Sequence, residues 1–273
     1  MRRGGGSGVG RKSGGWSARF LLLLAALVLT VVVGGYQRRT GPSWPVPVDV
    51  TLGGAWVRGE LPRSHPGEGG ARISLEAPGT VAGEIEWRRY PTRDPWTHIT
   101  MERQDGKLIA ELPHQPPAAK LEYSVRLRRG EAEATFPRDG AAVIRYRGDV
   151  PAAVLLPHIL CMFISLLFAI RAGLGGVVNE ARPARFIPWI LAFLVPGGLL
   201  LGPIVQKLSF GAYWTGWPFG EDWTDNKTLA VVLVWGLAWL WARRRPARER
   251  TAVLLAVVIM LAVYFIPHST LGS

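Results

Sequence analysis

Residues 20–36 read FLLLLAALVLTVVVGGY, an apolar run long enough to cross a bilayer as one helix. The Gly-, Ser- and Arg-rich stretch 1–18 precedes it and is predicted to be a disordered basic N-terminus. Arginines at 38 and 39 follow the run, and no small-x-small cleavage motif closes it. The segment 19–36 is therefore predicted to be an uncleaved transmembrane signal anchor, with a cleaved signal peptide as the alternative.

Four further apolar segments follow in the C-terminal half of the chain, at about 151–171, 186–206, 228–242 and 251–267. With the first run they predict five membrane spans, four of them in a helical region over 151–267. The third of these five contains Pro188, Pro196 and Pro203 and several glycines, so an uninterrupted straight helix is not expected there. The alternatives are a kinked helix packed among its neighbours and a discontinuous helix that lines a cavity.

The distribution of charge predicts an orientation. The net charge of +12 would suit a nucleic-acid-binding protein, but the arginines flank the apolar segments and form no single patch, so no nucleic acid partner is expected. The N-terminus and the loops 171–185 and 243–250 are strongly basic, whereas the 207–227 loop has two lysines against three carboxylates. The positive-inside rule then places the N-terminus in the cytoplasm and the C-terminus outside a bacterial cytoplasmic membrane.

The region 44–148 is predicted to be an extracytoplasmic domain of short β-strands. Apolar and polar residues alternate over 72–76, 84–87 and 121–127, as expected of strands with one buried face. The segment 98–112 predicts a hairpin that turns at Gln104-Asp105-Gly106. These signals favour an antiparallel β-sandwich inserted between the first span and the remaining four.

The run 96–127, WTHITMERQDGKLIAELPHQPPAAKLEYSVRL, resembles the middle strands of fibronectin type III and immunoglobulin-like domains of bacterial envelope proteins. The resemblance lies in a Trp, a D-G hairpin, an L-P strand ending and a Y-x-V strand, and it covers about a third of the domain. It implies a fold and no particular chemistry, since such domains share none. The histidines His65, His98 and His114 have no metal-ligand spacing and are expected at the surface.

The 207–227 loop reads KLSFGAYWTGWPFGEDWTDNK and is rich in aromatic residues. Such a composition favours an ordered aromatic cap in the membrane interface, with Trp214, Trp217 and Trp223 as its main rings. The loop also holds three carboxylates that could serve in acid–base chemistry or bind a hard cation: Glu221, Asp222 and Asp225. Asp225 alternatively caps the helix that follows.

Two histidines, His158 and His268, are expected near the outer membrane surface. A polar side chain at that depth suggests function by default. His158 shares a helix face with Cys161 and Met162, and His268 shares one with Met260 and Tyr264. Such sets could bind copper or haem iron, and hydrogen-bonded histidines beside packed methionines are the alternative. We expect the aromatic loop to fold over these ends and to bring Glu221 or Asp222 near a histidine.

Three functional hypotheses follow for this multi-domain membrane protein. The first is a non-enzymatic accessory or assembly component that displays its β-sandwich to a protein partner outside. The second is a membrane redox, metal- or haem-binding protein that uses His158 and His268. The third is a membrane enzyme that acts on a lipid-linked substrate with Glu221 and Asp222. A single cysteine, Cys161, excludes an internal disulfide.

Overall fold

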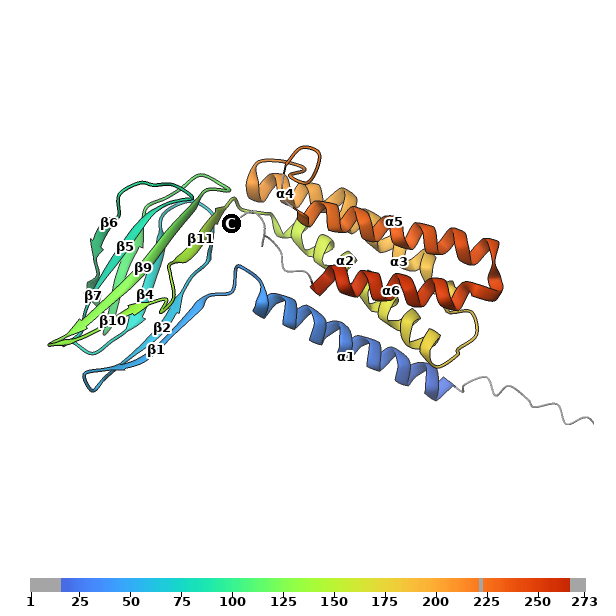
Figure 1. The fold of residues 1–273 in the computed structure, drawn as a ribbon, viewed down its shortest axis with the longest axis horizontal. Coiled ribbons are helices and arrows are strands. Elements are labelled where there is room, and N and C mark those ends of the chain that lie inside the picture. Colours follow the sequence, from blue (N-terminus) through green and yellow to red (C-terminus); the bar gives the residue numbers. More distant parts are fainter. Residues whose placement is uncertain (1–15, 221–222, 266–273) are drawn as a thin grey trace, which may run out of the picture. The chain divides into compact units, whose positions relative to one another are not determined.

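The computed structural model describes residues 16–220 and 223–265 and shows a chain of two β-sheets and several helices (Figure 1). The chain divides into two compact units. Of the described residues, the helical unit contains 16–35, 159–199 and 227–265, and the β unit contains 36–158 and 200–226 except 221–222. The segment 200–226 thus belongs with the β-sheets, although it lies far from them in sequence.

Among its described residues, the β unit contains eleven strands in two sheets. The first sheet has the order β1-β2-β4-β8-β7, and the second has β3-β11-β9-β5-β6, with β10 paired to β9. All pairs are antiparallel except β3 with β11. The strands are β1 Val46–Leu52, β2 Ala55–Leu61, β3 Ser64–Pro66, β4 Ala71–Glu76, β5 Ala82–Tyr90, β6 Thr97–Thr100, β7 Glu102–Gln104, β8 Lys107–Leu112, β9 Lys120–Arg129, β10 Ala132–Phe136 and β11 Ala142–Arg147.

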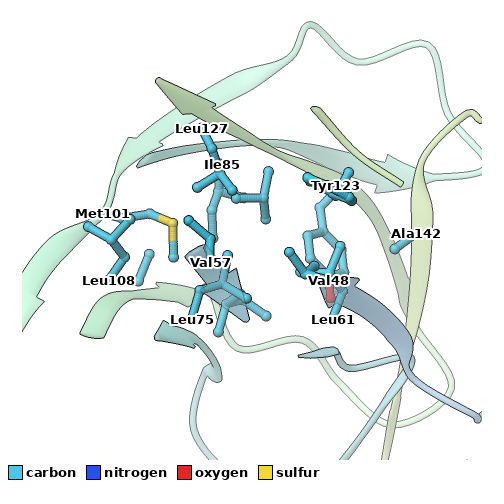
Figure 2. Close-up of a cluster of buried hydrophobic side chains, with 14 of the residues drawn as sticks. Val48, Val57, Leu61, Leu75, Ile85, Met101, Leu108, Tyr123, Leu127 and Ala142 are labelled. Carbon is cyan, nitrogen blue, oxygen red and sulfur yellow. The ribbon is translucent and has the colours of Figure 1, made fainter. Parts of the chain in front are cut away.

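Buried side chains from both sheets form one hydrophobic cluster, drawn in part in Figure 2. The predicted alternation over 72–76, 84–87 and 121–127 is confirmed, because the apolar residues of these segments enter this cluster and the polar residues between them do not: Ile73 and Leu75 of β4, Ile85 of β5 with Trp87 packed against the cluster, and Leu121, Tyr123, Val125 and Leu127 of β9. Tyr123 of β9 is fully buried, and its hydroxyl donates to the Pro62 carbonyl at 2.8 Å. The same burial raises the pKa of Tyr123 well above the ordinary tyrosine value.

The predicted hairpin over 98–112 is only partly correct. Its turn is present, since Asp105 and Gly106 both have positive φ, at 49° and 76°. Its first arm, however, breaks at Met101: β6 pairs with β5 in the second sheet, while β7 pairs with β8 in the first. Met101 is buried, and its amide donates to the Gly83 carbonyl at 2.8 Å. The chain passes from the second sheet to the first at Met101, whose side chain enters the hydrophobic cluster there, so the predicted arm is divided between the two sheets.

The helices are α1 Trp16–Thr40, α2 Ala152–Val177, the 3₁₀ turn η1 Pro183–Phe186, α3 Ile187–Leu194, η2 Val195–Leu201, α4 Gly202–Phe210, α5 Trp223–Arg244, the 3₁₀ turn η3 Pro246–Arg248 and α6 Glu249–Phe265. Among the described residues, three helices are long and apolar enough to cross a membrane: α1, α2 and the composite helix Pro183–Phe210. Along α1 only Ala26 and Thr30 are buried, and most of its leucines and valines remain exposed, as expected of a surface that lipid covers.

The composite helix Pro183–Phe210, the third candidate span, is irregular, as its prolines and glycines predict. Its central part, η2, is a π-helix, which joins α3 to α4. Wide turns of this kind occur where the regular hydrogen-bond ladder is interrupted. Here Gly197 packs closely on α2, since a Cβ at this position would lie 2.6 Å from the Cβ of Cys161. The glycine therefore allows close contact between the two helices.

Candidate functional site: the aromatic loop

The aromatic loop, residues 211–220, follows α4 directly and is the best candidate site among the residues that sequence analysis selected. Gly211 ends α4 in the left-handed conformation, with φ of 85°, and its amide donates to the Lys207 carbonyl at 2.9 Å. The Lys207 ammonium group donates back to the Gly211 carbonyl at 2.6 Å and lies 5.5 Å from the centre of the Tyr213 ring. These two hydrogen bonds between Lys207 and Gly211 fix the last turn of α4.

Two consecutive residues in the first turn of α5 bind the backbone of residues 215–217, which we call the neck of the loop. The Asp225 carboxylate accepts hydrogen bonds from the backbone amides of Thr215 at 2.7 Å and Gly216 at 3.3 Å. The Asn226 side-chain amide, oriented to satisfy both of its ends, donates to the Trp217 carbonyl at 3.2 Å and accepts from the Trp217 amide at 3.0 Å. Gln206 of α4 adds a bond to the Thr215 hydroxyl at 2.7 Å. These hydrogen bonds therefore fix the backbone of the neck.

The tip of the loop carries large rings that the protein leaves uncovered. Tyr213, Trp217 and Phe219 are 60%, 76% and 82% exposed. Trp214 is half-buried, and its indole N–H donates to the Trp217 carbonyl at 3.4 Å. Exposed aromatic rings on a fixed backbone are suited to a membrane interface or to a protein partner, because little entropy is lost when they are covered.

The base of the loop is joined to the second β-sheet. The Gly148 amide, just after β11, donates to the Ser209 carbonyl of α4 at 2.9 Å. The Arg145 guanidinium of β11 stacks over the Phe210 ring at 4.0 Å from its centre. A Cβ at Gly148 would collide with the Leu208 carbonyl oxygen, so glycine is needed for this approach. The end of the third candidate span is thus bound to the β unit.

The predicted polar cluster is only partly within the described residues. Glu221, Asp222 and His268 lie outside them, as does the side chain of Trp223, the first residue of α5. His158 lies in α2 and is half-buried. The proximity of these acids to His158 or His268 therefore stays a prediction, as does haem or copper binding. Asp225, in contrast, has a defined role: it holds the loop backbone.

The methionines considered as possible metal ligands beside the histidines, Met162 and Met260, are packed against other residues. Met260 of α6 is buried, and its sulfur accepts a hydrogen bond from the Trp235 indole at 3.1 Å. Met162 lies beside Gly197 and Gly198, where its sulfur would be 3.4 Å and 3.7 Å from added Cβ atoms. These contacts agree with the alternative reading of the methionines as packing residues.

A group that could hold a metal lies instead on the outward face of the second sheet. Glu84 and Glu86 of β5 and His98 of β6 place one ligand atom each within 4.8 Å of one another. Two carboxylates and an imidazole suit a first-row divalent cation. Arg126 already contacts Glu86 at 2.5 Å and would compete with the ion. Sequence spacing could not reveal this group, because Glu86 and His98 come together only where β5 pairs with β6. The Glu-x-Glu alternation at 84–86 was the available sequence signal for the two carboxylates.

The chain matches no protein-family model, and no curated protein matches it. The likeness of residues 96–127 to fibronectin type III and immunoglobulin-like domains consequently stays a prediction.

Proposed function

We propose that this chain is an accessory protein of a bacterial cytoplasmic membrane, in which a β-sandwich of the immunoglobulin-like type binds a protein partner outside. In this proposal α5 and α6 complete a set of five spans with the three apolar helices. The observation that carries it is the joint between β11 and the end of α4, made by Gly148 with Ser209 and by Arg145 with Phe210. A binding domain that is joined to the end of a span is held at the membrane surface.

The aromatic loop supports the same proposal. Tyr213, Trp217 and Phe219 project from a segment that directly follows a candidate span. Trp and Tyr rings are favoured at the boundary between hydrocarbon and water. With its rings in that boundary and its neck closed by Asp225 and Asn226, the loop would keep the β unit close to the bilayer.

The outward face of the second sheet is the surface that we propose for the partner. It presents Arg88, which stacks on Trp96 at 4.4 Å and pairs with Glu122 at 2.5 Å. Arg126 bridges Glu86 at 2.5 Å and Glu133 at 3.1 Å. Arginine and tryptophan are enriched at the centres of protein interfaces, and opposite charges held in pairs give a partner fixed polar contacts.

Site-specific photo-crosslinking in native membranes tests this surface. A photoreactive residue at His98 should give a discrete protein adduct, because the side chain lies on the proposed face and is half exposed. The same residue at Arg72, on the first sheet, is the control and should give none. Arg88→Ala should weaken the adduct at position 98. Equal products from both sheets, or lipid adducts alone, would contradict partner binding by this face.

The orientation has its own test, based on reporter domains that are active only outside the cytoplasm. A reporter inserted after Phe219, in the aromatic loop, should be active, and one inserted after Arg245, between α5 and α6, should be inactive. The expected difference rests on the arginines that surround Arg245. The reverse pattern would place the β unit in the cytoplasm and remove the basis of the proposed function.

A further inference from the structure

Three arginines surround a single carboxylate, Glu180, in the helical unit. Arg171 of α2 is nearly fully buried, with 4% of its side chain exposed, and its two terminal nitrogens donate to the two Glu180 oxygens at 2.7 Å and 3.1 Å. Arg185 donates to the same carboxylate at 2.6 Å. The Nε of Arg19 lies 3.8 Å from it. Glu180 is thus the common anion of this arginine cluster.

Each arginine of the cluster comes from a different candidate membrane span. Arg19 lies in the first turn of α1, Arg171 in the last two turns of α2, and Arg185 in the first turn of the composite helix Pro183–Phe210. The cluster therefore marks one common end of all three candidate spans. In a bilayer, that level is where the hydrocarbon ends and lipid headgroups begin.

The charges of the cluster do not balance. Arg171 binds both oxygens of Glu180, Arg185 shares one of them and Arg19 lies nearby, so three positive charges face the single negative charge of one carboxylate. These two side chains are also the accessible ones, at 56% and 39% exposed, against 4% for Arg171. Unbalanced cations at the edge of a low-dielectric layer attract an anion strongly.

We propose that the headgroup of an anionic phospholipid binds between Arg19 and Arg185. Its phosphate accepts the guanidinium hydrogens that remain after Arg185 has donated to Glu180 and to the Ala181 carbonyl at 3.2 Å, and its acyl chains lie along the exposed apolar side chains of α1. The planar donor array of arginine matches a phosphate better than a lysine ammonium does. Arg171 and Glu180 form the rigid support of the site, because their buried ion pair holds Arg185 in position. The site is separate from the outward face of the β unit, so its test is independent of partner binding.

The test uses the purified full chain in zwitterionic nanodiscs, with phosphatidylglycerol as the titrated probe and binding measured by native mass spectrometry. The double variant Arg19→Gln, Arg185→Gln should lose roughly tenfold or more in affinity, at about 1 kcal/mol per arginine near the surface. The control Arg244→Gln, Arg245→Gln removes the same charge from another exposed basic segment and should retain nearly wild-type binding. Thermal unfolding checks that both variants fold.

Three outcomes would overturn the proposal. Equal losses in the two double variants would show general attraction to charge. Unchanged binding in Arg19→Gln, Arg185→Gln would place the lipid elsewhere. Displacement of the lipid by inorganic phosphate at the same concentration would identify a site for soluble anions. The expected result is a loss specific to the Arg19 and Arg185 variant, with no competition from inorganic phosphate.

Discussion

Glu180→Gln should lower the free energy of unfolding of the helical unit by roughly 3–5 kcal/mol, the range seen when one partner of a buried ion pair is removed. Glutamine keeps the shape of the side chain but removes the charge that compensates Arg171, which is almost fully buried. Unfolding in detergent, followed by the loss of the helical circular dichroism signal, measures the effect. Glu249→Gln removes the same charge from the same unit and should cost less than about 1 kcal/mol.

The effect of Glu180→Gln should depend on pH. Hydrogen bonds from Arg171 hold the pKa of the Glu180 carboxyl below its usual range. A carboxyl with a depressed folded-state pKa stabilises the protein fully above its unfolded pKa of about 4.3, and this contribution is lost as the pH falls through the folded value. The stability difference between wild type and variant should thus shrink below about pH 4. A difference that stays constant from neutral to acidic pH would show that the charge of Glu180 is not its cause.

Tyr123→Ala should destabilise the β unit by roughly 3–5 kcal/mol, the cost typical of deleting a large buried ring. Tyr123 is fully buried between the two sheets (Figure 2), and its hydroxyl bonds the Pro62 carbonyl. Because the hydrophobic cluster lies entirely within residues 48–146, a fragment 44–148 should fold alone and allow denaturant unfolding to be followed by circular dichroism.

Two controls separate the contributions of Tyr123. Tyr123→Phe keeps the ring and should cost only about 1 kcal/mol, the typical net value of one hydrogen bond. In the full chain, Tyr213→Ala deletes an exposed ring and should change stability by less than about 0.5 kcal/mol. A fragment that folds only together with the helices, or a small effect of Tyr123→Ala, would show that the core is not closed within the β unit.

Patterns among neighbouring residues predicted the strands and the turn whose conformation those neighbours determine. Alternation identified β4, β5 and β9 because one face of each is buried, and Asp105-Gly106 identified a turn because that turn requires positive φ. The break at Met101 was missed, since a buried methionine between two strands looks like any other apolar position. The three arginines at Glu180 were seen only as topology signals, because their partner is shared by segments far apart in sequence.

The candidate site was predictable to a similar extent. Composition identified the aromatic loop. The spacing before α5 suggested a capping role for Asp225, which stays a prediction, but it did not suggest that the carboxylate accepts a hydrogen bond from the Thr215 amide, ten residues away. Nothing local predicts that the end of α4 packs with β11, because the contact of Ser209 with Gly148 joins positions about sixty residues apart. The same holds for His98, whose neighbours are set by strand register.

The break at Met101 also has a mechanical consequence. Strands β6 and β7 are separated by one residue, yet each is hydrogen-bonded to a strand of a different sheet. A one-residue slip of β7 along β8 would also shift β6 along β5, and every side chain on both strands would then face the wrong side of its sheet. Shearing one sheet over the other therefore requires two hydrogen-bond ladders to yield together. The single residue between them, Met101, therefore couples the register of the two sheets.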